Sequence, residues 1–277
     1  MNKKGQVTIF IIIGIVLVSI VATFFLLRSG VLPDISGEEK NPNAFLQSCL
    51  QDKIIDGVKL ISLHGGDIEP QPLSIPFKFE ANSAPMNISY LCYTSNYYLL
   101  CNPQEAMLMS HIKEELHNYI SEDVADCFNK LSSSLEKGGY EASSSYRGFE
   151  VEMTDGKIII PIDAGITLTQ NEETKKYENF SFIIPSRIYD LTFVAQEIVN
   201  SEATKGEFKI DDLTAYPQLI SSNAANEEFN YNLAYADFDI NKFKTTDSAI
   251  VYKIKHIDSK EEFYFAVRSS VIKPGWF

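Results

Sequence analysis

One uninterrupted apolar segment near the N-terminus constrains this chain more than any other feature of its sequence. Residues 7–27 contain no charged side chain, follow Lys3 and Lys4, and precede Arg28. A helix of this length spans about 31 Å, which matches the roughly 30 Å hydrocarbon core of a bilayer. The segment is apolar around its circumference and longer than the apolar part of a secretory signal. We therefore predict a transmembrane helix over residues 7–28 that contacts lipid through residues 7–27.

The charges on either side of this segment predict its orientation. Residues 1–6 are short and basic, whereas residues 29–43 form a polar, largely acidic stalk that contains Gly and Pro. Positive residues are retained on the cytoplasmic side, so we expect the N-terminus in the cytoplasm and residues 44–277 outside it. The predicted location is the cell membrane, with a single-pass chain and an extracytoplasmic C-terminal domain.

The composition of the exported part limits its partners. All 37 Asp and Glu residues follow residue 32, whereas 21 of the 24 Lys and Arg residues do, so this part carries a formal net charge of −16. Such an acidic surface repels nucleic acid, which we exclude as a partner. The length suffices for one large domain or for two small ones, and the candidate subdomains are residues 44–140 and 146–277.

Hydrophobic periodicity predicts helices and antiparallel strands in separate runs. Tight-turn residues at 155–156 and 258–260 lie between apolar segments, which indicates two hairpins. Asn102 and Pro103 are expected to start the second helix, with Asn as the cap. This pattern predicts an α+β fold. Apolar residues at helical spacing cover residues 44–63, 102–135 and 186–203.

Four cysteines follow the apolar segment, and an even number outside the cell is typical of disulfides. Cys92 and Cys101 lie in an aromatic segment that is predicted to form two short strands around residues 94–96, so pairing across this hairpin is geometrically easy. Cys49 and Cys127, both in predicted helices, would form the second bridge. The spacing does not resemble a zinc site, and the alternative is that the thiols are free and buried.

The same aromatic segment holds the best candidate for an interaction surface. Tyr90, Tyr93, Tyr97 and Tyr98 lie within nine residues. Tyrosine offers a large amphipathic contact area at a small cost in entropy. The alternative is ordinary sheet packing, because alternation in a hairpin would bury half of these side chains.

No catalytic motif accompanies these features. His111 and His117 lie six positions apart on one predicted helix, so they do not form a metal-binding pair and are expected at its edge. No nucleophile elbow, phosphate loop or dinucleotide fingerprint is present. We assign no catalytic, cofactor-binding or metal-binding residue. The triplets that begin at Asn87 and Asn179 fit the N-glycosylation pattern and are consistent with an exported domain.

The N-terminal residues resemble a known processing signal. Lys3, Lys4, Gly5 and Gln6, with the apolar run after them, resemble the archaeal class III, or prepilin-type, signal. The resemblance implies cleavage between Gly5 and Gln6 and retention of the helix as an anchor or a filament core. Type IV pilins commonly carry Glu five residues into the mature helix, where this chain has Phe10.

A second stretch resembles archaeal single-pass surface proteins that carry a class III N-terminal signal. The residues that carry this resemblance are Cys49, Leu50, Gly57 and the run from His64 to Ile68, which contains Gly65 and Gly66. No activity is established for those proteins. The resemblance therefore implies a location at the cell surface and no functional residue.

Three classes of function follow from the sequence. We predict a membrane-anchored extracytoplasmic binding or surface-interaction protein, whose partner outside the cell is a protein or a surface and which needs no cofactor. The alternative is a minor pilin-like or filament-associated subunit, in which one helix would continue from residue 7 past residue 45. Gly30 and Pro33 instead predict that the anchor helix ends near Ser29. An exported enzyme would need a cleft that gathers carboxylates or histidines from distant positions.

Overall fold

The computed structural model describes residues 41–80, 83–137, 140–170, 173–209 and 237–272. The predicted anchor, its orientation, the processing site at Gly5 and Gln6, and nearly all of the stalk lie outside these residues. No helix in the described part of the chain is long and apolar enough to cross a membrane. Residues 43–277 form one compact unit, and the candidate boundary between residues 140 and 146 does not divide it.

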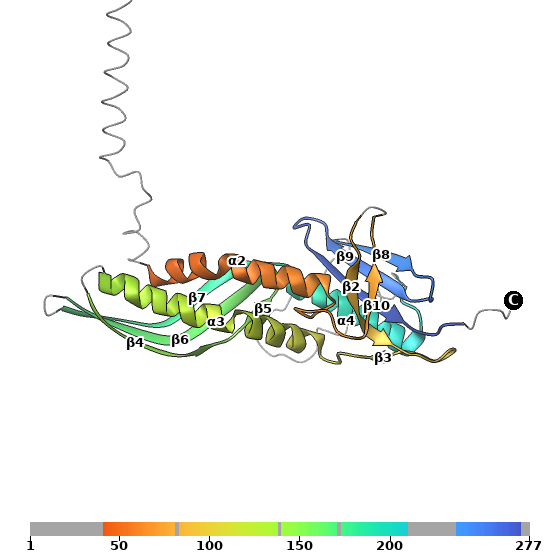
Figure 1. The fold of residues 1–277 in the computed structure, drawn as a ribbon, viewed down its shortest axis with the longest axis horizontal. Coiled ribbons are helices and arrows are strands. Elements are labelled where there is room, and N and C mark those ends of the chain that lie inside the picture. Colours follow the sequence, from red (N-terminus) through yellow and green to blue (C-terminus); the bar gives the residue numbers. More distant parts are fainter. Residues whose placement is uncertain (1–40, 81–82, 138–139, 171–172, 210–236, 273–277) are drawn as a thin grey trace, which may run out of the picture. The chain divides into compact units, whose positions relative to one another are not determined.

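The described residues contain three helices and two sheets, as expected for the predicted α+β class (Figure 1). The helices are α2 (Pro42–Leu63), α3 (Leu108–Lys137) and α4 (Ile188–Lys205). The first sheet has the order β1 (Ser74–Phe77), β2 (Met86–Tyr93), β10 (Glu262–Arg268), β9 (Ile250–His256) and β8 (Phe238–Lys244), and β3 (Asn102–Pro103) pairs with β2. The second sheet contains β4 (Glu141–Phe149), β5 (Glu152–Thr154), β6 (Lys157–Gln170) and β7 (Glu173–Pro185).

The second sheet buries one face beneath α2 and α3. Side chains alternate along a strand, so every second residue of β6 and β7 points to the same face. The helices pack closely above this face, because Gly57 of α2 leaves room for α3. A Cβ at Gly57 would lie 2.8 Å from Leu116 Cδ1 and 2.8 Å from Tyr119 Cδ1. The buried residues of β6 and β7 are Ile158, Ile160, Ile162, Ala164, Ile166, Leu168, Phe180, Phe182 and Ile184.

Side chains of α2 also cover the free edge of the second sheet. The Asn43 side-chain oxygen accepts a hydrogen bond from Ser181 N at 3.1 Å, and Gln47 Nε2 donates to Ile183 O at 3.2 Å. These two bonds satisfy backbone groups of β7 that no further strand pairs with. The strand β7 is therefore fixed against the first half of α2.

The first sheet is buried on both faces. Strand β2 runs parallel to β10, and the other neighbouring strands are antiparallel. Helix α4 packs against β2, β9 and β10 and joins the main core. The other face carries a smaller aromatic cluster, in which the Phe79 ring lies 4.8 Å from Tyr264 and 5.2 Å from Phe243.

Helix α4 begins at a carboxylate from the turn between β9 and β10. Glu261 accepts hydrogen bonds from Ser186 Oγ at 2.7 Å and from Arg187 N at 2.9 Å. Ser186 Oγ in turn accepts one from Ile188 N at 3.2 Å. An anion at a helix N-terminus is stabilised by the free N–H groups and the helix dipole. These hydrogen bonds join the β9–β10 turn to the start of α4, two segments that are far apart in sequence.

The chain around residue 102 differs from the predicted helix start. Asn102 and Pro103 pair with Tyr93 and Cys92 as strand β3, and α3 begins at Leu108. The disulfide at the preceding cysteine holds these residues against β2. An Asn-Pro pair can start a helix only where the chain is free to turn, so tertiary structure overrides the local signal.

Candidate functional site

The structure contains two disulfides, and they are the two predicted pairs. Cys49 of α2 bonds to Cys127 of α3, with Cα atoms 6.1 Å apart, and Cys92 of β2 bonds to Cys101, with Cα atoms 5.4 Å apart. The described residues hold no free cysteine, so the alternative of buried free thiols is wrong. The first bridge joins two core helices, and the second closes a short loop.

The loop closed by Cys92 and Cys101 lies alongside the residues that come after β10. Thr94 N donates to Arg268 O at 3.0 Å, and Tyr98 N donates to Val271 O at 2.9 Å. These bonds replace the cross-strand bonds of the predicted aromatic hairpin, which is therefore wrong apart from the short pairing of β2 with β3. The loop has a fixed shape because a covalent bond closes it and backbone hydrogen bonds hold it to residues 268–271.

Large apolar side chains are exposed on this loop and on the segment beside it. The exposed fractions are 41% for Tyr97, 57% for Tyr98, 54% for Leu99, 44% for Leu100 and 54% for Ile272. We call these five residues the loop patch. Strand β3 and the loop before it lie at the end of the unit opposite the first turn of α2 (Figure 1). A group of exposed Tyr, Leu and Ile side chains is typical of an interaction site.

The four candidate tyrosines divide into two kinds. Tyr90 is 7% exposed in the smaller core cluster, where burial, reinforced by the nearby Asp247 carboxylate, raises its pKa to about 12. Tyr93 is half-buried, with its ring 5.0 Å from that of Tyr90. The alternative of sheet packing therefore holds for this pair, whereas Tyr97 and Tyr98 are available to a partner.

A β-bulge explains why Tyr90 and Tyr93 meet. Residues three apart on a regular strand point to opposite faces. The register between β2 and β10 shifts so that Ala266 pairs with Tyr90 and Val267 pairs with Cys92. The extra residue of β2 shifts the alternation of the side chains after it by one position. The rings of Tyr90 and Tyr93 therefore lie on the same face.

Arg268 connects the buried tyrosines to the loop patch. Its guanidinium carbon lies 6.0 Å from the Tyr93 ring centre and 5.6 Å from the Tyr97 ring centre, and its Nη1 donates to Thr94 O. Cation–π contacts with two rings fix the position of Tyr97. Arg268 could not be predicted as part of this surface, because no local sequence pattern relates it to Thr94, 174 positions earlier.

A polar network joins the end of α2 to the start of α3. His111 Nε2 lies 2.9 Å from Asp67 Oδ1, which also accepts from Gln71 Nε2 at 2.8 Å. The hydrogen bond to Asp67 raises the pKa of His111, with a further contribution from Glu105. The expectation of a solvated edge histidine is therefore wrong for His111. Asp67 is 3% exposed and its neighbours satisfy it, so the network is structural.

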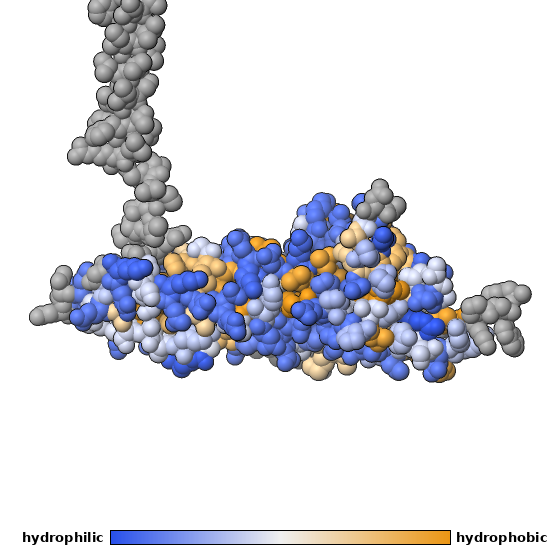
Figure 2. All heavy atoms as spheres, viewed as in Figure 1, coloured by the Kyte–Doolittle hydropathy of each residue, from blue (hydrophilic) through white to orange (hydrophobic). Residues whose placement is uncertain are grey.

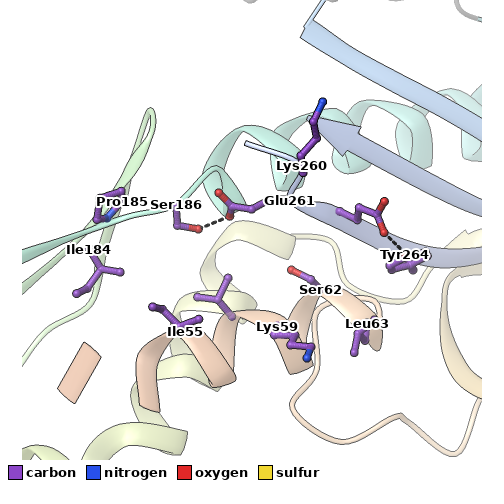
Figure 3. Close-up of a pocket in the computed structure, with 12 residues that line it drawn as sticks. Ile55, Lys59, Ser62, Leu63, Ile184, Pro185, Ser186, Lys260, Glu261 and Tyr264 are labelled. Carbon is purple, nitrogen blue, oxygen red and sulfur yellow. Dashed lines mark hydrogen bonds between the residues drawn. The ribbon is translucent and has the colours of Figure 1, made fainter. Parts of the chain in front are cut away.

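A cleft of about 420 Å³ lies between the second half of α2 and the turn that caps α4 (Figure 3). We call it the α2 cleft. Apolar residues gather along α2 and between α2 and β2 in the surface view, whereas α3 is mostly hydrophilic (Figure 2). The volume is in the range of small-molecule sites. The lining residues are Ile55, Val58, Lys59, Ser62, Leu63, Ile184, Pro185, Ser186, Lys260, Glu261, Glu262 and Tyr264.

The remaining candidate positions are separate from both surfaces. Asn87 of β2 and Asn179 of β7 are exposed, and Asn179 has a positive φ of 57°. Among the described residues, no group of three or more His, Cys, Asp or Glu side chains is placed to hold a metal ion. Within the described residues, the loop patch and the α2 cleft are the candidate sites with mainly apolar surfaces.

Comparison of the chain with protein-family models, with curated proteins and with solved structures finds no match. The chemistry and geometry of the two candidate sites therefore carry the argument about function.

Proposed function

We propose that this protein is a membrane-anchored extracytoplasmic interaction module whose loop patch binds a protein on the outside of the cell. The observation that carries this proposal is the exposure of four large apolar side chains on a loop that a disulfide holds in shape, with a fifth, Ile272, on the segment beside it. A rigid loop binds at a lower cost in entropy than a mobile one, and tyrosines are frequent anchors of protein interfaces.

The sequence supports the proposed location. The apolar run of residues 7–27 is long enough to span a bilayer, and the basic residues before it favour a cytoplasmic N-terminus. Two disulfides are typical of proteins that fold in an oxidising compartment. The acidic surface disfavours nucleic acid as the partner.

The start of α2 favours an anchored module over a pilin-like subunit. A pilin would pack its sheet against the second half of the anchor helix. The helix that packs against the second sheet here begins at Pro42, and Asn41 lies outside it. We therefore place the pilin-like role second, supported by the resemblance of the N-terminus to a prepilin-type signal.

Site-specific crosslinking in the cells that produce the protein tests this proposal. A photo-reactive phenylalanine analogue at Tyr98 should give a discrete crosslinked product with a second protein, because this side chain is the most exposed of the loop patch. The same analogue at Glu114, an exposed position on α3, is the matched control and should give none. No product at Tyr98, or the same product at both positions, would contradict the proposal.

Fractionation of the same cells tests the anchor. The full chain should stay with the membrane after extraction at high pH, and protease added to intact cells should remove its C-terminal domain. Recovery of the protein in sheared extracellular filaments would favour the pilin-like role instead.

A further inference from the structure

The α2 cleft contains a serine hydroxyl that has no hydrogen-bond partner in the described part of the chain. Ser62 is 8% exposed, lines the cleft, and makes no hydrogen bond with any described residue. Its oxygen points toward the side of the cleft formed by Ser186 and Glu261 (Figure 3). No fully buried side-chain oxygen of the described residues lacks a partner, so the Ser62 oxygen is accessible from the cleft and is free to donate to a polar ligand atom.

The two carboxylates of the cleft both have partners within the protein. Glu261 is held by Ser186 Oγ and by the backbone N–H of Arg187. Glu262 lies 2.8 Å from Lys253 Nζ and 3.7 Å from Lys255 Nζ. Lysine ammonium groups therefore balance the charge of Glu262, whereas Glu261 keeps its charge and is stabilised by neutral donors at the N-terminus of α4.

The two lysines of the lining differ in their contacts. Lys260 Nζ donates to Ile257 O. Lys59 makes no ion pair or hydrogen bond within the part of the chain that the structure describes. It precedes Ser62 by three positions, so both side chains lie on the same side of α2. The flexible stem of Lys59 lets its ammonium reach a ligand beside the Ser62 hydroxyl.

The apolar part of the lining comes from α2 and the end of β7, with the Tyr264 ring of β10 beside them. Ile55, Val58 and Leu63 project from α2, and Ile184 and Pro185 come from the end of β7. These side chains offer a surface for a hydrocarbon group next to the Lys59 ammonium. A single ammonium and a single hydroxyl match one carboxylate better than a phosphate, which needs more donors.

We propose that the α2 cleft binds a small amphipathic carboxylate, with its hydrocarbon chain against the apolar lining and its carboxylate at Lys59 and Ser62. The carboxylate accepts a hydrogen bond from the Ser62 hydroxyl and pairs with the Lys59 ammonium. This site is independent of the loop patch, so failure of either proposal leaves the other standing.

Binding of octanoate to the full chain in nanodiscs of neutral lipid tests the proposal, with empty nanodiscs as the blank. We expect a dissociation constant on the order of 0.1–1 mM, as for a ligand of about ten heavy atoms. Lys59→Gln should weaken octanoate binding about tenfold and leave binding of 1-octanol unchanged, because the alcohol has no charge. Lys130→Gln removes the same charge from an exposed position on α3 and should change neither.

A second variant tests whether the ligand binds inside the α2 cleft. Ser62→Leu fills the space around the hydroxyl and should abolish binding of both octanoate and 1-octanol, with thermal unfolding as the check that the variant folds. If this variant does not fold, Lys59→Gln still tests the proposal, because Lys59 is exposed and its replacement should not disturb the fold. Absence of octanoate binding at 10 mM, equal binding to the parent and Lys59→Gln, or full binding to a folded Ser62→Leu variant would each overturn the proposal.

Discussion

The two disulfides lie in regions that use apolar residues in opposite ways. Around Cys49–Cys127, the apolar side chains of α2 and α3 are buried against the second sheet, and the bridge joins elements that already pack together. Around Cys92–Cys101, Tyr98 and other large side chains remain exposed, and the bridge fixes a loop that has little core of its own. The same covalent bond therefore supports stability in one region and the shape of a surface in the other.

Removal of each disulfide should separate these roles, and the helix pair should show the largest effect. Cys49 and Cys127 are 78 positions apart, so the bridge strongly restricts the unfolded chain. Replacing both by Ala should lower the free energy of unfolding by about 4.5 kcal/mol in the loop-entropy model. Urea unfolding of the purified full-length chain measures this change. A loss below about 1 kcal/mol would mean that the bridge does not support the core.

Removal of the loop disulfide should affect stability less and binding more. Cys92 and Cys101 are nine positions apart, and the same model gives a loss of about 2.5 kcal/mol for the double Ala variant. The crosslinked product at Tyr98 should disappear, because the patch loses its fixed shape. If the product persists at the parent level, the rigid loop is not what the partner recognises. The Cys49 and Cys127 double variant, assayed under conditions where it stays folded, is the control.

Single substitutions compare how tightly side chains are packed between α2 and α3 and in the loop patch. Gly57→Ala adds one methyl group where α2 meets α3 and should cost about 1–3 kcal/mol of unfolding free energy, despite the higher helix propensity of Ala. Leu99→Ala removes most of a large side chain, yet that side chain is 54% exposed and the cost should stay within about 0.5 kcal/mol. Chemical unfolding measures both, and a reversed order would show that the loop patch is part of the core.

Local sequence patterns were enough to predict those helices and strands whose own residues show a clear hydrophobic periodicity. The helix α2, most of α3 and the hairpin of β9 and β10 were predicted from spacing and turn residues, as were both disulfide pairs. Strand β4 was not predicted. Its Ser-rich sequence is held as a strand by pairing with β6, and sequence alone does not show that pairing.

The candidate sites depend on contacts that no single segment contains. Tyr97 and Tyr98 were predicted as a surface, but Arg268 and Ile272 joined them only when the chain after β10 came alongside the loop. The α2 cleft was not predicted, because α2, β7 and the β9–β10 turn are far apart in sequence. Ser62 gave no local signal, since a single Ser in a helix is ordinary.

The smallest expected effect concerns the pH dependence of the network around His111. The hydrogen bond to Asp67, with the nearby Glu105 and Glu115 carboxylates, raises the pKa of His111 in the folded chain, although burial opposes the shift. The folded state therefore binds this proton more tightly than the unfolded state. The resulting stability is complete below the unfolded pKa of about 6.5 and is lost as the pH rises through the higher folded value.

His111→Gln tests this linkage, because Gln keeps a hydrogen bond to Asp67 but does not titrate. The free energy of unfolding of the parent minus that of the variant should fall between pH 5.5 and 8.5 by up to about 1 kcal/mol, the range of partly exposed ion pairs. Asn118→Gln is the matched control at an exposed, non-titrating position on the same helix, and it should keep the pH dependence of the parent. A parent-minus-variant difference that is flat with pH, or that rises with it, would show that the network joins α2 to α3 through hydrogen bonds alone, without a contribution from the charge on His111.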